Sequence, residues 1–127
     1  MNIRKPTNYS AMYAVLDRLM VEELPQVELY FEIGRAVCAR TEKGAAVAAS
    51  EYLQGAYPET VGFSPRNLRR MREFFRIYEN IPELRRLAMK ISWTQNVVIL
   101  EAELTMEERA WYLRAAEQFS WSKKELA

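Results

Sequence analysis

The sequence predicts an all-α fold of about six helices that form one domain over residues 1–127. Three observations support this prediction. Apolar residues recur every three or four positions along most of the chain, which is the period of a helix packed on one face. Three segments place Glu or Gln three positions after Ser or Thr, a pattern typical of helix starts. No segment alternates apolar and polar residues like a half-buried strand, so at most a minimal β wing is expected, near Val61.

The first three helices are predicted in the N-terminal part of the chain. The apolar stripe of the first consists of Tyr9, Met12 or Tyr13, Leu16, Leu19 and Met20. Pro25 separates it from the second helix, whose apolar face consists of Val27, Tyr30, Phe31, Gly34, Val37 and Cys38. Gly34 is expected to allow close contact with a neighbouring helix, and Gly44 is expected to cap the end of this second helix. A third helix, rich in small residues, is predicted over about 45–56.

The later helices are predicted from their start signals. Ser64-Pro65 favours a helix start, because the serine oxygen caps free N–H groups and proline suits the first helical position. This fourth helix is predicted to end near Asn80 and to bury Leu68, Met71, Phe74 or Phe75, and Tyr78. Further helices are predicted from the three capping-box patterns, which begin at Ser92, Thr105 and Ser122. The tryptophans Trp93, Trp111 and Trp121 are predicted to pack in the core rather than to stack on bases.

The absence of histidine limits the chemistry that the chain can perform. Without imidazole, serine and cysteine nucleophiles lack their usual base, and nearly all zinc sites lose a ligand type. The carboxylates show no pattern of a metal-dependent nuclease. We therefore predict a protein that is not an enzyme and that binds no metal or cofactor.

The composition also predicts a cytoplasmic protein. A single cysteine, Cys38, excludes an internal disulfide and fits a reducing compartment. Because Cys38 falls on the apolar face of a helix, we expect a buried and inert thiol. The sequence has no long apolar run and its start lacks the apolar region of a signal peptide, so neither a membrane span nor a signal peptide is predicted.

The net charge of +1 is unevenly distributed along the chain. Residues 1–59 contain six Lys/Arg and eight Asp/Glu, a net charge of −2. Residues 60–90 contain eight Lys/Arg and three Asp/Glu, a net charge of +5. Residues 91–127 contain four Lys/Arg and six Asp/Glu, again −2. One basic face on a nearly neutral protein indicates a localised anionic partner.

The basic block lies in a predicted helix-turn-helix motif over about residues 45–79. With the apolar residues turned inward, the outer face of its second helix and the edges of that face carry Arg66, Asn67, Arg69, Arg70 and Glu73. In this motif the second helix lies in the major groove, where arginine suits guanine and phosphate and asparagine suits adenine. Ser64 and the first-turn N–H groups suit a phosphate. The predicted binding residues for double-stranded DNA are Ser64, Arg66, Asn67, Arg69, Arg70 and Arg76.

Two other interpretations of the pattern stay open. Arginine is a good helix former, so a basic helix face is also typical of a solvated surface without a ligand. The face also fits a protein-interaction adaptor or inhibitor, of the kind that mobile elements encode, which grips an acidic protein surface.

Four segments carry a resemblance to a known family. They are LYFEIGRAV (29–37), GFSPRNLRRMREFF (62–75), ISWTQ (91–95) and RAWYLRAAEQFSWSKKEL (109–126). In this order they are similar to motifs of the N-terminal domain of the YhcG family, which precedes a PD-(D/E)XK nuclease domain in full-length members. The GFS-x-x-NL-x-x-MR-x-F signature is the most specific of them. Departures are Gln95, where family members often have His, and Lys124, where they often have Arg.

The resemblance implies a helix-turn-helix-like DNA-binding module. It supports a DNA-binding role for Ser64, Arg66, Asn67, Arg69 and Arg70. Nuclease activity is not carried over, because no nuclease domain is expected within residues 1–127. The expected function is to place the chain itself, or a nuclease or other protein partner, on DNA. A homodimer is compatible with this function.

Overall fold

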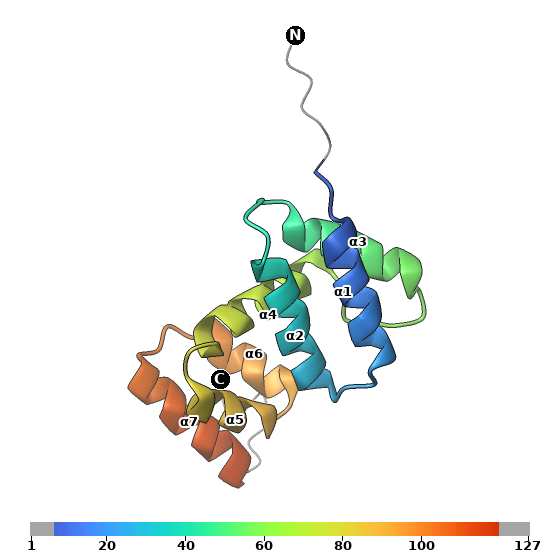
Figure 1. The fold of residues 1–127 in the computed structure, drawn as a ribbon. Helices are drawn as coiled ribbons and strands as arrows, with labels where there is room; N and C mark the ends of the chain where they lie inside the picture. The colour runs from blue at the N-terminus through green and yellow to red at the C-terminus, as the bar shows by residue number, and fades with distance from the viewer. Residues whose placement is uncertain (1–6, 120–127) are drawn as a thin grey trace.

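The computed structural model describes residues 7–119, which form seven helices (Figure 1). These are α1 (Ser10–Val21), α2 (Gln26–Cys38), α3 (Ala45–Ala56), α4 (Pro65–Tyr78), α5 (Pro82–Met89), α6 (Trp93–Glu101) and α7 (Met106–Phe119). The all-α prediction is confirmed, with one helix more than the approximate number expected. Residues 7–119 contain no strand, so the minimal β wing near Val61 does not form there. The capping box predicted at Ser122 lies outside the described residues.

The centre of the fold is the contact between α2 and α4, the most extensive between any two helices. Large aromatic side chains meet in it: the ring centre of Phe31 lies 6.0 Å from that of Phe74 and 5.1 Å from that of Phe75. Gly34 makes the close approach possible, because a Cβ atom there would lie 2.1 Å from the carbonyl oxygen of Met71. The expected close contact at Gly34 is thereby confirmed, and its partner is the backbone of α4.

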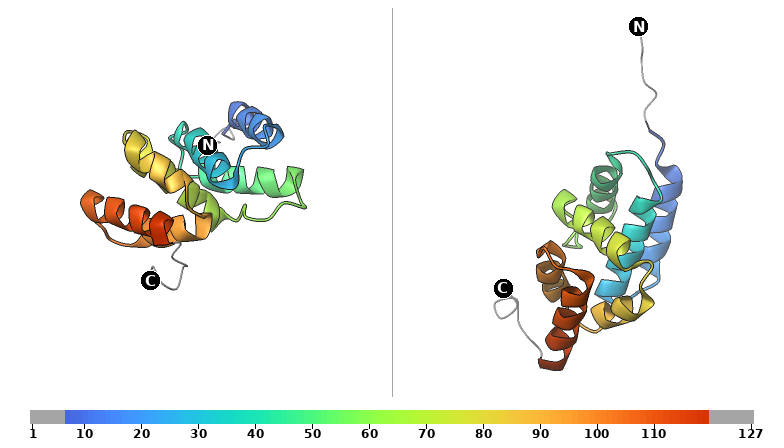
Figure 2. Two further views of the ribbon diagram at one scale, coloured as in Figure 1. Left: turned by 90° about the horizontal axis from the view of Figure 1, so that it is seen from below. Right: turned by 90° about the vertical axis from the view of Figure 1, so that its left-hand side faces the viewer.

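The other helices cover this pair from two sides. Figures 1 and 2 show α1 and α3 on one side of α2 and α4, and α5, α6 and α7 on the other. The helices α1 and α3 contact each other as well as the central pair, and α7 packs on α5 and α6. As a result, α4 touches both groups, and its start lies between α3 and α6.

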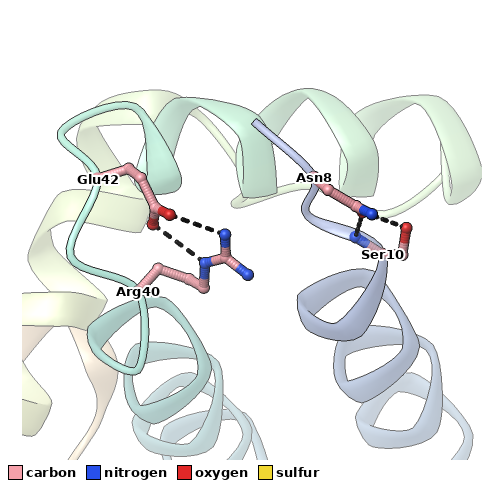
Figure 3. A network of polar contacts seen from close by, with 4 residues as sticks. All are labelled: Asn8, Ser10, Arg40 and Glu42. Carbon is pink, nitrogen blue, oxygen red and sulfur yellow. Dashed lines mark hydrogen bonds and ion pairs between the residues drawn. The ribbon is translucent and has the colours of Figure 1, made fainter. Parts of the chain in front are cut away.

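The loop between α2 and α3 differs from the prediction. The helix α2 ends at Cys38, and Gly44 is the residue that precedes α3 rather than the cap of α2. Arg40 and Glu42 form a bidentate ion pair within the loop, with N–O distances of 2.8 and 3.0 Å (Figure 3). The guanidinium of Arg40 also lies 5.0 Å from the ring centre of Tyr9, so the loop is tied to the start of α1.

The start of α1 has its own polar contacts. Figure 3 shows the Asn8 side chain turned toward Ser10. Its Oδ1 accepts a hydrogen bond of 2.9 Å from the Ser10 N–H and a second one from the Ser10 hydroxyl. These bonds satisfy one backbone N–H group that the first turn of the helix leaves free.

The helix starts predicted from capping signals are confirmed at three places. Ser64 caps α4 by accepting from the Asn67 N–H at 3.1 Å. Ser92 and Gln95 form the predicted capping box of α6. Thr105 and Glu108 bond each other's backbone N–H groups at the start of α7.

Two predictions about packing and helices are wrong. No helix was predicted between Asn80 and Ser92, yet α5 forms there, with Pro82 in its first turn and Leu84 and Ala88 buried. Trp111 was predicted to be in the core, but 56% of it is exposed because it lies on the outer side of α7. Trp93 is buried as predicted, and Trp121 lies outside the described residues.

Candidate nucleic-acid interface

The segment before α4 holds the start of that helix in place. Gly62 has φ +100°, a left-handed conformation that suits glycine, and a Cβ atom there would lie 2.4 Å from the Tyr30 hydroxyl oxygen. Phe63 is buried, and its carbonyl oxygen accepts hydrogen bonds from Ser50 Oγ at 2.6 Å and Gln54 Nε2 at 2.9 Å. The first turn of α4 is therefore fixed against both α2 and α3.

Asn67 lies at the inner edge of the α4 face rather than on its outer surface. Its Nδ2 donates to the carbonyl oxygen of Gly62 at 2.6 Å, and its Oδ1 accepts from the indole N–H of Trp93 at 2.9 Å. Both ends of the half-buried amide are thus used inside the fold. The geometry gives Asn67 a structural function, which is to connect the start of α4 with α6.

Arg70 is also engaged within the fold. Its Nε lies 2.6 Å from Oε1 of Glu101, the last residue of α6, and only 25% of the Arg70 side chain is exposed. The charge of Arg70 is therefore largely balanced by a carboxylate from a distant part of the sequence. Sequence periodicity places Arg70 at the edge of the face but does not reveal this partner.

Arg66, Arg69 and Arg76 project from the exposed side of α4. Arg66 and Arg69 form no ion pair within residues 7–119. Arg76 has a loose contact of 3.8 Å with Glu73, and both side chains are more than half exposed, so their pairing is weak. Three of the six predicted residues therefore present their charge to solvent on one helix face.

Two further basic residues lie next to this face and were not among the predicted set. Arg72 is half-buried on the side of α4 that faces the α2–α3 loop, and Lys43 is exposed on that loop. The spacing of Arg69, Arg72 and Arg76 over two helical turns was a usable signal for Arg72. No sequence signal places Lys43 beside α4, because the contact depends on how the loop folds.

The predicted helix-turn-helix is present only in outline. The helices α3 and α4 pack against each other as expected. However, eight residues, 57–64, connect them, whereas the turn of the motif usually has three or four. The connection is longer because Phe63 turns back to contact α3 before α4 begins.

The described residues offer no alternative site of obvious chemistry. Within residues 7–119, no three His, Cys, Asp or Glu side chains group in a way that could hold a metal ion. None of the helices described is long and apolar enough to cross a membrane.

A family model of the DUF1016 N-terminal domain matches residues 19–127. The chain belongs to this family. Membership is consistent with the resemblance to the YhcG N-terminal domain found in the sequence. Searches among curated proteins and solved structures found no match.

The segment 62–75, on which the resemblance to the YhcG N-terminal domain is most specific, has a structural explanation. Gly62 supplies the left-handed turn, Phe63 and Leu68 are buried, Ser64 caps α4 and Asn67 connects α4 to Trp93. Of the arginines in the same segment, Arg70 is balanced by Glu101, Arg72 is half-buried, and Arg66 and Arg69 are exposed. Most residues of this segment therefore hold α4 in place, and its exposed arginines face solvent.

Proposed function

We propose that this DUF1016 N-terminal domain is a non-catalytic module that binds double-stranded DNA through the exposed face of α4. The observation that carries the proposal is the position of Arg66 and Arg69. Both are exposed in the first turns of α4 and form no ion pair within residues 7–119. They lie in the segment 60–90 that concentrates a net charge of +5.

The proposed contacts follow from the geometry of α4. Its first turns enter the major groove, as in a helix-turn-helix, with Arg66 and Arg69 directed to base edges or phosphates. Arg66 and Arg76 are about 15 Å apart along the helix axis, because ten residues separate them and each adds about 1.5 Å. This length is comparable to the major groove width of about 12 Å, so the two ends of α4 suit phosphates on opposite groove walls. Ser64 and Asn67 support this arrangement by fixing the start of α4.

The test is a double variant, Arg66→Ala with Arg69→Ala. If the wild type neutralises three to five phosphates, log affinity falls with log salt at a slope of about −3 to −4.5. Loss of two contacts reduces the steepness of that slope by about 2 and weakens binding at moderate salt. Fluorescence anisotropy with a short labelled duplex at several salt concentrations measures both quantities.

The matched control removes the same charge elsewhere. Arg18→Ala with Arg114→Ala takes two exposed arginines from α1 and α7, and DNA affinity is expected to change little. Both double variants should keep the thermal stability of the wild type, because exposed charges contribute little to stability. Equal DNA affinity in the two double variants would contradict the proposal. Absence of duplex binding in the wild type, with binding to an acidic protein, would favour the adaptor function instead.

The resemblance to the YhcG N-terminal domain extends the proposal to a targeting role. In that view, binding through α4 positions a nuclease or another protein partner on DNA. Fusion of a non-specific nuclease domain to this chain provides the test, since cleavage near bound duplexes should then depend on Arg66 and Arg69.

A further inference from the structure

A hollow of about 500 Å³ lies between the α2–α3 loop and α4. Its lining includes Cys38, Arg40, Glu42, Lys43, Arg72 and Arg76. Four of these side chains are cations and one is a carboxylate. Such an excess of one charge sign around a concave surface attracts a counter-ion more strongly than a flat surface does.

The single carboxylate does not balance the hollow, because it is already paired. Glu42 forms the bidentate ion pair with Arg40 shown in Figure 3, and this guanidinium holds the pKa of the Glu42 carboxyl below its usual value. Charge-assisted pairs of this geometry are directional as well as strong, so the pair fixes the loop that forms one wall of the hollow.

The remaining cations are those of Lys43, Arg72 and Arg76. Neither Lys43 nor Arg72 forms an ion pair within residues 7–119, and Arg76 pairs loosely with Glu73 and also interacts with the Cys38 thiol. Three like charges around one hollow repel one another until an anion enters. Concentrated negative charge would therefore favour a ligand in this hollow.

We propose that this hollow binds a backbone phosphate of duplex DNA, with Lys43, Arg72 and Arg76 as its ligands. The inference rests on the proposed function: because α4 is proposed to bind DNA, the anion next to α4 is taken to be a DNA phosphate. Arg72 and Arg76 are one helical turn apart, and Arg69 lies one turn before Arg72, so the hollow continues the row of exposed arginines on α4. A strand whose bases meet the first turns of α4 therefore passes its backbone along this row toward the α2–α3 loop.

Cys38 supplies a built-in reporter of the occupied hollow. It is the only cysteine in the chain, it is half-buried, and its thiol lies 3.5 Å from the carbonyl oxygen of Arg72. Burial raises the pKa of the thiol, although Arg76 and Arg72 oppose this shift. The sequence-based expectation of a buried thiol is wrong, since Cys38 is only half-buried and forms part of the hollow wall.

The first experiment measures the reaction of Cys38 with a neutral maleimide, with and without saturating duplex DNA. A DNA backbone in the hollow is expected to slow the reaction at least about fivefold. Inorganic phosphate at the same ionic strength serves as the comparison. Protection by inorganic phosphate without protection by duplex would overturn the proposal, because the hollow would then take a free anion.

The second experiment uses Lys43→Gln and Arg72→Gln, with Arg18→Gln as the control. Each hollow variant is expected to reduce the steepness of the salt slope by about 0.9, the contribution of one phosphate, and the control should leave it unchanged. Lys43 is exposed, so its variant tests the proposal without a risk to folding. If the duplex binds but both slopes equal that of the wild type and Cys38 is unprotected, the hollow is excluded while binding through Arg66 and Arg69 stands. If no duplex binds the wild type, the proposed function and this inference both fail.

Discussion

The arginines of α4 differ in how much charge each presents to a partner. Arg66 and Arg69 are exposed, Arg76 is loosely paired, and Arg70 is balanced by Glu101 at 2.6 Å. A count of basic residues therefore overestimates the charge available on this face. Glu101 acts as an internal competitor of any anion that approaches Arg70.

Removal of this competitor gives a first prediction at the residue scale. Glu101→Gln frees the Arg70 guanidinium and removes one negative charge next to α4. Duplex affinity is expected to rise several-fold, with a salt slope steeper by up to about 0.9. Anisotropy titrations measure this change, and Glu103→Gln is the control because Glu103 is exposed two residues after the end of α6 and forms no salt bridge within residues 7–119. Equal gains in the two variants would show that only net charge matters.

A second polar network lies away from the candidate interface. The Asp17 carboxylate accepts hydrogen bonds from the hydroxyls of Tyr52 at 2.6 Å and Tyr57 at 2.7 Å, which connects α1 to α3 and to the residue that follows it. These bonds lower the pKa of Asp17. The hydrogen bond between Tyr52 and Asp17 raises the pKa of Tyr52 to about 12, from an ordinary value of 10.0.

These pKa shifts predict how stability depends on pH. Because the pKa of Asp17 is lowered by folding, its contribution is present above the ordinary value of 3.8 and is lost as pH falls through the folded pKa. Because the pKa of Tyr52 is raised, its contribution is present below 10.0 and is lost as pH rises to about 12. Tyr52→Phe is expected to reduce both dependences, measured by chemical denaturation across pH. Tyr112→Phe is the control, since that hydroxyl makes no hydrogen bond within residues 7–119. An unchanged pH profile in Tyr52→Phe would refute this assignment.

At the scale of helices, the contact between α2 and α4 depends on one missing side chain. Gly34→Ala places a Cβ atom 2.1 Å from the backbone oxygen of Met71, so the two helices must separate. The free energy of unfolding is expected to fall by about 1–3 kcal/mol or more, as for other overpacked cores. Gly55→Ala in α3 is the control, because no atom lies within 4 Å of the added Cβ, and it is expected to stabilise by up to about 1 kcal/mol. Thermal and urea unfolding measure both, and a neutral Gly34→Ala would disprove the close packing.

Helix starts were predictable because their signals are local. The caps of α4, α6 and α7 each lie within four residues of sequence and formed where they were predicted. The helix α5 has only two turns, too few for its apolar period to emerge, so its signal was limited to Pro82. The end of α2 was misplaced because Gly44 was interpreted as a cap, whereas the Arg40–Glu42 pair and Tyr9 hold the loop around it.

At the scale of the whole molecule, the fold class and the basic face were predictable, but the distribution of charge on that face was not. Glu101 approaches Arg70 across 31 positions of sequence, and Lys43 reaches the side of Arg72 through a loop. Both contacts arise only when α4 is placed between its two groups of neighbours. The exposure of Trp111 was unpredictable for the same reason. Helical spacing places an apolar residue on one face of its helix, but it does not show whether another helix covers that face.

The hydrogen bond between Trp93 and Asn67 has a consequence for how the family changes over evolution. A descendant that replaces Trp93 by a residue without an N–H group leaves the Asn67 oxygen without its donor, at the position where α4 begins. A descendant that replaces Asn67 leaves the indole N–H and the Gly62 carbonyl oxygen without their partner. Either change alone costs about 1–3 kcal/mol for each buried polar group left unsatisfied. The two positions, 26 residues apart, are therefore expected to vary together among related chains, whereas Arg66 and Arg69, which are exposed and form no ion pair within residues 7–119, are expected to vary independently of them.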